Sequence, residues 1–280
     1  RLLAEALHRE QSFPIDSSAA VAEEFLQLVG KRLHILVERA PGMWGFFHLT
    51  FQEFFAAVWL CVDDSLETEG LKHLLDPRWE EVLRLAVGYL GIQQGRAKAV
   101  SSFLEKVLAY RAQGRDAWRT DVIFRHHCLA ALFLAEAGRA VRPDVAESVA
   151  SAFIDCATTA EIRVPRRYFD EIRACEGVDR FKPMLRAVLR RPVAEHAFAA
   201  IDAAVELRAT DACPELAALV QSEHEGIAVH ALFALRALSP NIASAHAERI
   251  VASPISTNSR FMCALHLLFG SRFSPSDVGA

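Results

Sequence analysis

Apolar residues recur with two different periods along the chain, and the change of period divides it. Up to residue 62 the pattern runs from helical to strand-like and back, whereas from residue 63 onward the apolar stripes keep the period of an α-helix. We therefore expect a mainly α fold, with a small module over residues 1–62 and a helical array over residues 63–280. The charged sequence Asp63-Asp64-Ser65 marks the boundary between them.

The small module shows the order helix, hairpin, helix. Residues 21–31 have helical spacing, and their apolar side chains are expected to point inward; these are Val21, Phe25, Leu28 and Val29. Apolar positions then alternate over residues 33–38, Pro41-Gly42 supplies a turn, and an aromatic run resumes at Gly45. This order predicts a winged-helix module with a β-hairpin, whose wing tip is formed by residues 39–45.

The second helix of the module carries the densest local signal. Thr50 is a favourable N-cap residue and Glu53 follows three positions later, so a capping box is expected to start the helix at Thr50. The following apolar residues share one helical stripe: Phe51, Phe54, Phe55, Val58 and Val62. We expect this helix to lie in the core.

Residues 36–42 (Leu-Val-Glu-Arg-Ala-Pro-Gly) and 47–57 (Phe-His-Leu-Thr-Phe-Gln-Glu-Phe-Phe-Ala-Ala) resemble the end of the winged-helix region of NACHT-type signal-transduction NTPases. This family includes animal NOD-like receptors and bacterial relatives. The resemblance implies that His48 lies near the phosphates of ADP in the resting state. The residues alone leave open a second interpretation, in which His48 only ends a strand and packs under the wing.

The same resemblance implies partners and a cofactor. Because the chain begins without Met inside an apparently helical segment, we expect a fragment whose preceding part is the NACHT nucleotide-binding core. The parent protein would bind ADP or ATP with Mg²⁺, whereas this fragment alone would hold neither. Self-oligomerisation on activation and a role in innate or anti-phage defence are also implied.

Three similar helical segments recur in the second half of the chain. His196-Ala-Phe-Ala-Ala-Ile201, His230-Ala-Leu-Phe-Ala-Leu235 and Cys263-Ala-Leu-His-Leu-Leu268 are spaced by 34 and 33 residues. Short breaks that contain Gly or Pro separate the helical segments of this half. A helix-pair repeat explains this spacing, and the pattern is similar to HEAT-like repeats that stack into an α-solenoid.

Composition adds limits on location and partners. Of the 280 residues, 52% are apolar, and the formal net charge is −4, which gives no general expectation of affinity for nucleic acid or membranes. No apolar stretch reaches the roughly 18 residues of a membrane span, so we expect a cytoplasmic protein. The six cysteines are scattered without a C-x-x-C pair and are expected to be reduced core residues.

Known catalytic motifs are absent from the sequence. Gly30-Lys31-Arg32 lacks the first glycine and the hydroxyl of a phosphate-binding loop, so this chain is not expected to be an enzyme by itself. His126 and His127 are adjacent in a predicted helix and point in different directions, which makes a shared metal improbable. No nucleophile elbow or zinc helix is present either.

Residues 163–191 carry the one marked charge bias, with nine basic and four acidic residues. The candidate ligand or partner patch consists of Arg163, Arg166, Arg167, Arg173, Arg186, Arg190 and Arg191. Clustered arginines on stacked helices could bind phosphate, nucleic acid or an acidic protein surface. The other interpretation is a solvated face with local ion pairs.

Together these features predict the carboxy-terminal regulatory and sensor region of a NACHT-family NTPase, with a protein or other ligand bound by the helical array. The alternative is a HEAT-like scaffold for protein interactions without nucleotide dependence. A winged-helix DNA binder has weaker support, because the hairpin tip carries only one basic residue, Arg39.

Overall fold

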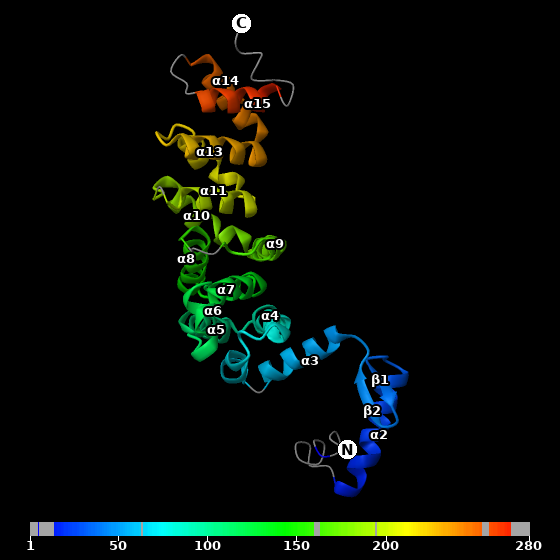
Figure 1. The fold of residues 1–280 in the computed structure, drawn as a ribbon. Helices are drawn as coiled ribbons and strands as arrows, with labels where there is room; N and C mark the ends of the chain where they lie inside the picture. Colours follow the sequence, from blue (N-terminus) through cyan, green and yellow to red (C-terminus); the bar gives the residue numbers. More distant parts are fainter. Residues whose placement is uncertain are drawn as a thin grey trace.

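A computed structural model describes residues 5, 14–62, 64–159, 163–193, 195–253 and 258–269. Within these residues the chain is mainly helical and contains one two-stranded antiparallel sheet. The hairpin and the first helices lie at one end of an elongated molecule and the last helix lies at the other (Figure 1). The mainly α prediction is confirmed for the described residues.

The first part of the chain has the predicted order helix, hairpin, helix. Its elements are α2 (Ile15–Lys31), β1 (Leu36–Ala40), β2 (Met43–Phe46) and α3 (Leu49–Val62). In the hairpin Leu36 pairs with Phe46 and Val37 with Gly45, and the turn at Pro41-Gly42 is closed by Gly42 at φ +71°. Glycine suits this turn because its lack of a Cβ permits positive φ.

The first strand begins at Leu36, three residues later than the alternation over residues 33–38 predicts. His34 has φ +53°, which is incompatible with an extended strand. In α2 the inward prediction is also wrong for Phe25 and Leu28, which are exposed, whereas Ala22 and Val29 are buried.

Helix α3 differs most from its prediction. It begins at Leu49, one residue before Thr50, and its buried residues are Ala57, Leu60 and Cys61. The predicted core stripe is largely exposed, with relative accessibilities of 37% for Phe51 and 67% for Val62. The prediction of a core helix is wrong because α3 is buried only on the face that carries Ala57, Leu60 and Cys61, while its aromatic side is only partly covered.

The remaining elements are helical, and η marks short 3-10 or π-helical turns. In chain order they are η1 (Leu66–Gly70), η2 (Pro77–Trp79), α4 (Glu80–Gly88), η3 (Tyr89–Gln93), α5 (Ala97–Ala109), η4 (Gly114–Asp116), α6 (Ala117–Asp121), α7 (Arg125–Glu136), α8 (Pro143–Thr159), α9 (Arg166–Ala174), η5 (Glu176–Arg180), α10 (Lys182–Arg190), α11 (Ala197–Glu206), η6 (Thr210–Ala212), α12 (Cys213–Leu219), α13 (Glu225–Leu238), α14 (Pro240–Ala252) and α15 (Asn258–Phe269).

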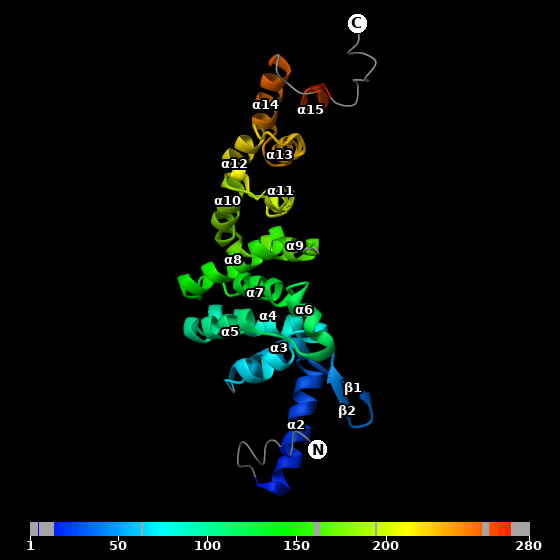
Figure 2. The same ribbon diagram turned by 60° about the vertical axis from the view of Figure 1, so that its left-hand side comes forward.

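These helices pack in chain order. Figure 2 shows α10, α12 and α14 along one side of the molecule and α11, α13 and α15 along the other. Some helices contact a neighbour in the sequence, as α7 contacts α8 and α13 contacts α14, and others contact the equivalent helix of the next pair, as α11 contacts α13 and α13 contacts α15. Between α6 and α7 the helical backbone is interrupted, because Phe124 has φ +48°.

One apolar core runs through the array from Ala57 to Ala264. Phe153 of α8 lies near its middle, with ring centroids 5.4 Å from Phe169 and 5.5 Å from Phe181. All six cysteines are free, and all but Cys175 are buried, which agrees with the prediction of core cysteines.

We expect Phe153→Ala to lower the free energy of unfolding by about 3–5 kcal/mol, because it removes a fully buried ring from a closely packed site. Urea denaturation followed by circular dichroism measures this loss. Phe233→Ala is the matched control, since that ring is partly exposed on α13. An equal loss in both variants would contradict the assigned role of Phe153.

Candidate functional site

His48 lies in the short link between β2 and α3. Its side chain is exposed, and its ring meets Phe47 edge-on at 4.5 Å between centroids. Its backbone carbonyl accepts a hydrogen bond from the Phe51 N–H at 3.2 Å. The ring therefore faces solvent rather than packing under the hairpin, and the implied contact with ADP stays a prediction.

Exposed apolar side chains of α3 lie next to His48. Phe51, Phe55, Trp59 and Val62 follow one another at helical spacing along one side of α3, and all four are exposed. We call these four residues the apolar face of α3. Phe47 and Leu49 extend it toward His48. Large contiguous apolar surfaces are uncommon on monomeric proteins and often mark a binding site for another protein or domain.

The arginines of residues 163–191 do not form one continuous patch. Most of them pair with acidic side chains on other helices or nearby on their own. The ion pairs are Arg163 with Asp202, Arg166 with Glu206, Arg167 with Glu80, Arg173 with Asp170 and Glu206, and Arg186 and Arg190 with Glu215. For Arg191 no ion pair is found within the described residues. The structure thus divides the candidate patch into one group around α9 and α11 and another on α10.

Glu215 of α12 holds the second group together. Its side chain is 6% exposed, and its Oε1 atom accepts hydrogen bonds from Arg186 Nε at 3.0 Å and from Arg190 Nε at 3.1 Å. Burial by itself would raise the pKa of Glu215, but the bonds from the two arginines outweigh it and lower the pKa below its usual value. This cluster ties α10 to α12.

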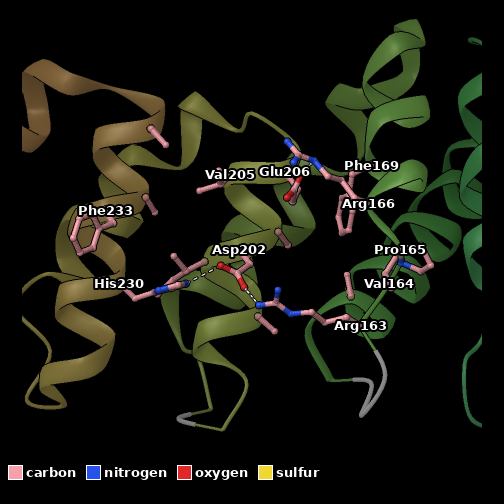
Figure 3. A pocket seen from close by; sticks show the side chains of 16 residues that line it. Arg163, Val164, Pro165, Arg166, Phe169, Asp202, Val205, Glu206, His230 and Phe233 are labelled. Carbon is pink, nitrogen blue, oxygen red and sulfur yellow. Dashed lines mark hydrogen bonds and ion pairs between the residues drawn. The ribbon is translucent and has the colours of Figure 1, made fainter.

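A groove of about 660 Å³ crosses the array between α9, α11 and α13. Figure 3 shows His230 and Arg163 reaching Asp202 from opposite sides of this groove. The Nε2 atom of His230 lies 2.7 Å from Oδ1 of Asp202, and Arg163 pairs with the other carboxylate oxygen. Arg166 Nε lies 3.2 Å from Oε2 of Glu206. Asp202 and Glu206 are four residues apart, so both face the groove from α11.

The charges of the groove differ in how firmly they are held. The side chains of Arg163 and Arg166 are 87% and 74% exposed, whereas those of Asp202 and Glu206 are about one-third exposed. Exposed arginines lose little when they leave an ion pair. The acidic groups are therefore the fixed charges. They lie between apolar walls that include Phe169 and Phe233, and a cationic group could bind them only by displacing the exposed arginines.

Sequence reasoning identified Arg163 and Arg166 of this groove but missed Asp202, Glu206 and His230. The spacing of Asp202 and Glu206 was a usable signal, because it places two carboxylates on one helix face. Their partners lie 39 and 40 residues earlier in the chain, and local periodicity gives no information on such pairs.

Comparisons with protein-family models, with curated proteins and with solved structures found no match to this chain. The expected relation to NACHT-type proteins therefore stays a prediction from residues 36–42 and 47–57. Among the described residues no helix is both long and apolar enough to cross a membrane, and no cluster of three or more potential metal ligands occurs.

We expect Glu215→Gln to lower the melting temperature at pH 7, because the variant loses the charge that Arg186 and Arg190 surround. The pKa of Glu215 is lower in the folded chain, so its stabilising effect is complete above the unfolded pKa of about 4.3 and disappears as the pH falls through the folded pKa. The difference from wild type should shrink below pH ~4. Differential scanning calorimetry measures it, and the same pattern in the exposed-site control Glu195→Gln would contradict this explanation.

Proposed function

We propose that this chain is the carboxy-terminal regulatory region of a NACHT-type signal-transduction NTPase. In this proposal α2, the hairpin and α3 form the winged-helix module, which packs on an upstream nucleotide-binding core. The proposal depends on one observation: His48 is exposed at the junction of the hairpin and α3, beside the apolar face of α3. A side chain that contacts the nucleotide of another domain needs such a position.

The helical array is the proposed sensor. The packing of helix pairs in chain order, with similar segments in α11, α13 and α15 at spacings of 34 and 33 residues, supports a HEAT-like solenoid. Such arrays offer extended surfaces for a protein or other ligand. The groove between α9, α11 and α13 is the best-defined candidate for ligand contact within the described residues.

The proposed mechanism is a two-state switch. In the resting state the module would hold ADP in the parent protein through His48, while ADP or ATP and Mg²⁺ would be bound by the upstream core. A ligand on the array favours the open state only by the difference between its affinities for the two states. Opening would expose surfaces for self-oligomerisation, and a role in innate or anti-phage defence follows from the resemblance.

A HEAT-like interaction scaffold without nucleotide is the second candidate, and the groove is the observation that favours it. Its fixed carboxylates and apolar walls suit a basic segment of a partner protein. DNA binding through the hairpin has less support, because Arg39 donates a hydrogen bond to the carbonyl of Phe46.

The test of the switch uses the longest natural form of the protein. We expect wild type to retain ADP after purification and His48→Ala to lose most of it, since the variant lacks the side chain that would contact the phosphates. Chromatography of the nucleotide released by denaturation measures this. His266→Ala, at an exposed position on α15, is the control. No nucleotide in any of the three proteins would favour the scaffold.

We expect a double substitution on the apolar face of α3, Phe51→Ser with Trp59→Ser, to weaken packing of the module on the core. The same full-length protein should then release ADP faster, and limited proteolysis should cut more readily between the core and the module. Val193→Ser, the control, changes an apolar residue elsewhere in the chain that is more exposed than Phe51 or Trp59. Unchanged ADP release in the double variant would mean that this face does not contact the core.

A further inference from the structure

A second and smaller cavity, of about 220 Å³, lies where α7 and α9 begin. Three arginines line it: Arg125, Arg163 and Arg167. The buried side chains of Cys128 and Tyr168 form part of the wall. This volume is below the roughly 300–1,000 Å³ of sites for drug-sized ligands, so the cavity suits a small group rather than a whole cofactor.

The positive charges around this cavity exceed the negative ones. A single carboxylate, that of Glu80, is shared by Arg125 and Arg167 at distances of 3.2 and 3.5 Å. Arg163 pairs instead with Asp202, which also contacts His230. Arg125 and Arg167 thus share the single carboxylate of Glu80 as their ion-pair partner, with Glu171 as a further acid near Arg167, and an added anion would give the two guanidinium groups acceptors of their own.

Arg125 also has an unused donor. Its Nε atom is buried and has no hydrogen-bond partner within the described part of the chain. A buried donor without an acceptor costs free energy, and the cost is larger for a charged group. An anion in the cavity would supply acceptor oxygens of the kind that guanidinium groups bind in paired geometry.

The N-terminal ends of α7 and α9 add positive electrostatic potential to the cavity. Arg125 is the first residue of α7, and Arg167 is the second of α9. Neither first turn contains an acidic residue, and neither N-cap side chain accepts a hydrogen bond from the helix. Cations at a helix N-terminus oppose the helix dipole, so these positions are unfavourable for stability and favourable for binding an anion.

Tyr168 completes the donor set. Its hydroxyl oxygen accepts a hydrogen bond from Arg167 Nη2 at 2.9 Å. The hydroxyl of a tyrosine is protonated at neutral pH, and burial raises the pKa of Tyr168 further. Its O–H group can therefore donate a hydrogen bond to an anion.

We propose that this cavity binds the phosphate group of a small molecule, with Arg125 and Arg167 as fixed partners and Arg163 as a movable one. A phosphate dianion offers more charge and more acceptor oxygens than a carboxylate, which matches three guanidinium groups. If Arg163 turns toward the phosphate, Asp202 loses one cationic partner. A phosphate in the cavity and a cationic ligand in the neighbouring groove then favour each other. The proposal holds whether or not the chain belongs to a NACHT-type protein.

The experiment uses the chain of residues 1–280 and inorganic phosphate as the probe. Isothermal titration calorimetry in a chloride buffer of constant ionic strength measures the dissociation constant. We expect saturable binding of one phosphate per chain, with a dissociation constant at least about tenfold higher in Arg125→Gln and in Arg167→Gln. Arg163→Gln should weaken binding less, because Arg163 starts in another ion pair.

Arg191→Gln is the control, since it makes the same change of charge at an exposed position outside the cavity. An equal loss in this control would mean that phosphate responds only to net charge and would overturn the proposal. So would the absence of saturable binding by wild type up to about 10 mM phosphate, a limit near the weak end of specific affinities. Circular dichroism identifies any variant that fails to fold, and Arg163→Gln, at a largely exposed side chain, then remains as a test.

Titrations with ribose 5-phosphate and adenosine monophosphate identify which kind of molecule carries the phosphate. Tighter binding of either one than of inorganic phosphate, and loss of that binding in Arg167→Gln, would extend the proposal to that class. Tighter binding that persists in Arg167→Gln would place the contact elsewhere and count against the cavity.

Discussion

The structure depends on one constraint: each helix of the array buries its apolar stripe against helices that are close to it in the sequence. Leu83, Phe103, Phe133, Phe153 and Phe181 come from successive segments, and all are fully buried in one continuous core. Because these contacts are local, the array needs no distant partner to complete its core. Its surface side chains are not needed to complete the core. Both candidate sites of the array, the groove and the smaller cavity, lie between successive helices.

This locality also explains how much the sequence could predict. The helical period and the Gly or Pro breaks correctly predicted that the chain after residue 63 is a series of helices, since the apolar stripe that sets the period is buried by neighbouring helices. The prediction failed for α3, where the period correctly indicated a helix but not which face is covered. Helix α3 packs against α4, and its buried residues are Ala57, Leu60 and Cys61, while Phe51 and Trp59 stay exposed.

The sites were harder to predict than the helices for a related reason. The arginines of residues 163–191 form a cluster in the sequence. Whether they are paired or free to bind a ligand depends on Glu80, Asp202 and Glu215, which are distant in the chain. Conversely, Arg125 lies outside that cluster and was not predicted as a site residue, although it lines the cavity together with Arg163 and Arg167. Residue types indicate which groups are available, but only the packing of α7 against α9 brings these groups together.

The proposed sensor and His48 lie in different parts of the chain, and a packed route joins them. Arg84 of α4 donates hydrogen bonds to Glu136 of α7 and, at 2.6 Å, to Glu171 of α9, the helix that carries Arg166 of the groove. On its other side α4 packs against α3, where the thiol of Cys61 donates to the carbonyl of Ala86. If ligand binding shifted α9, the hydrogen bond between Arg84 and Glu171 would transmit the movement to α4 first and to α3 only through α4. Since these side chains are largely shielded from solvent and breaking their ion pairs costs free energy, α4, α7 and α9 are expected to move together rather than separately. In the proposed switch, the contact of α3 with α4 would be the place where movement of the array changes the orientation of α3 and the hairpin.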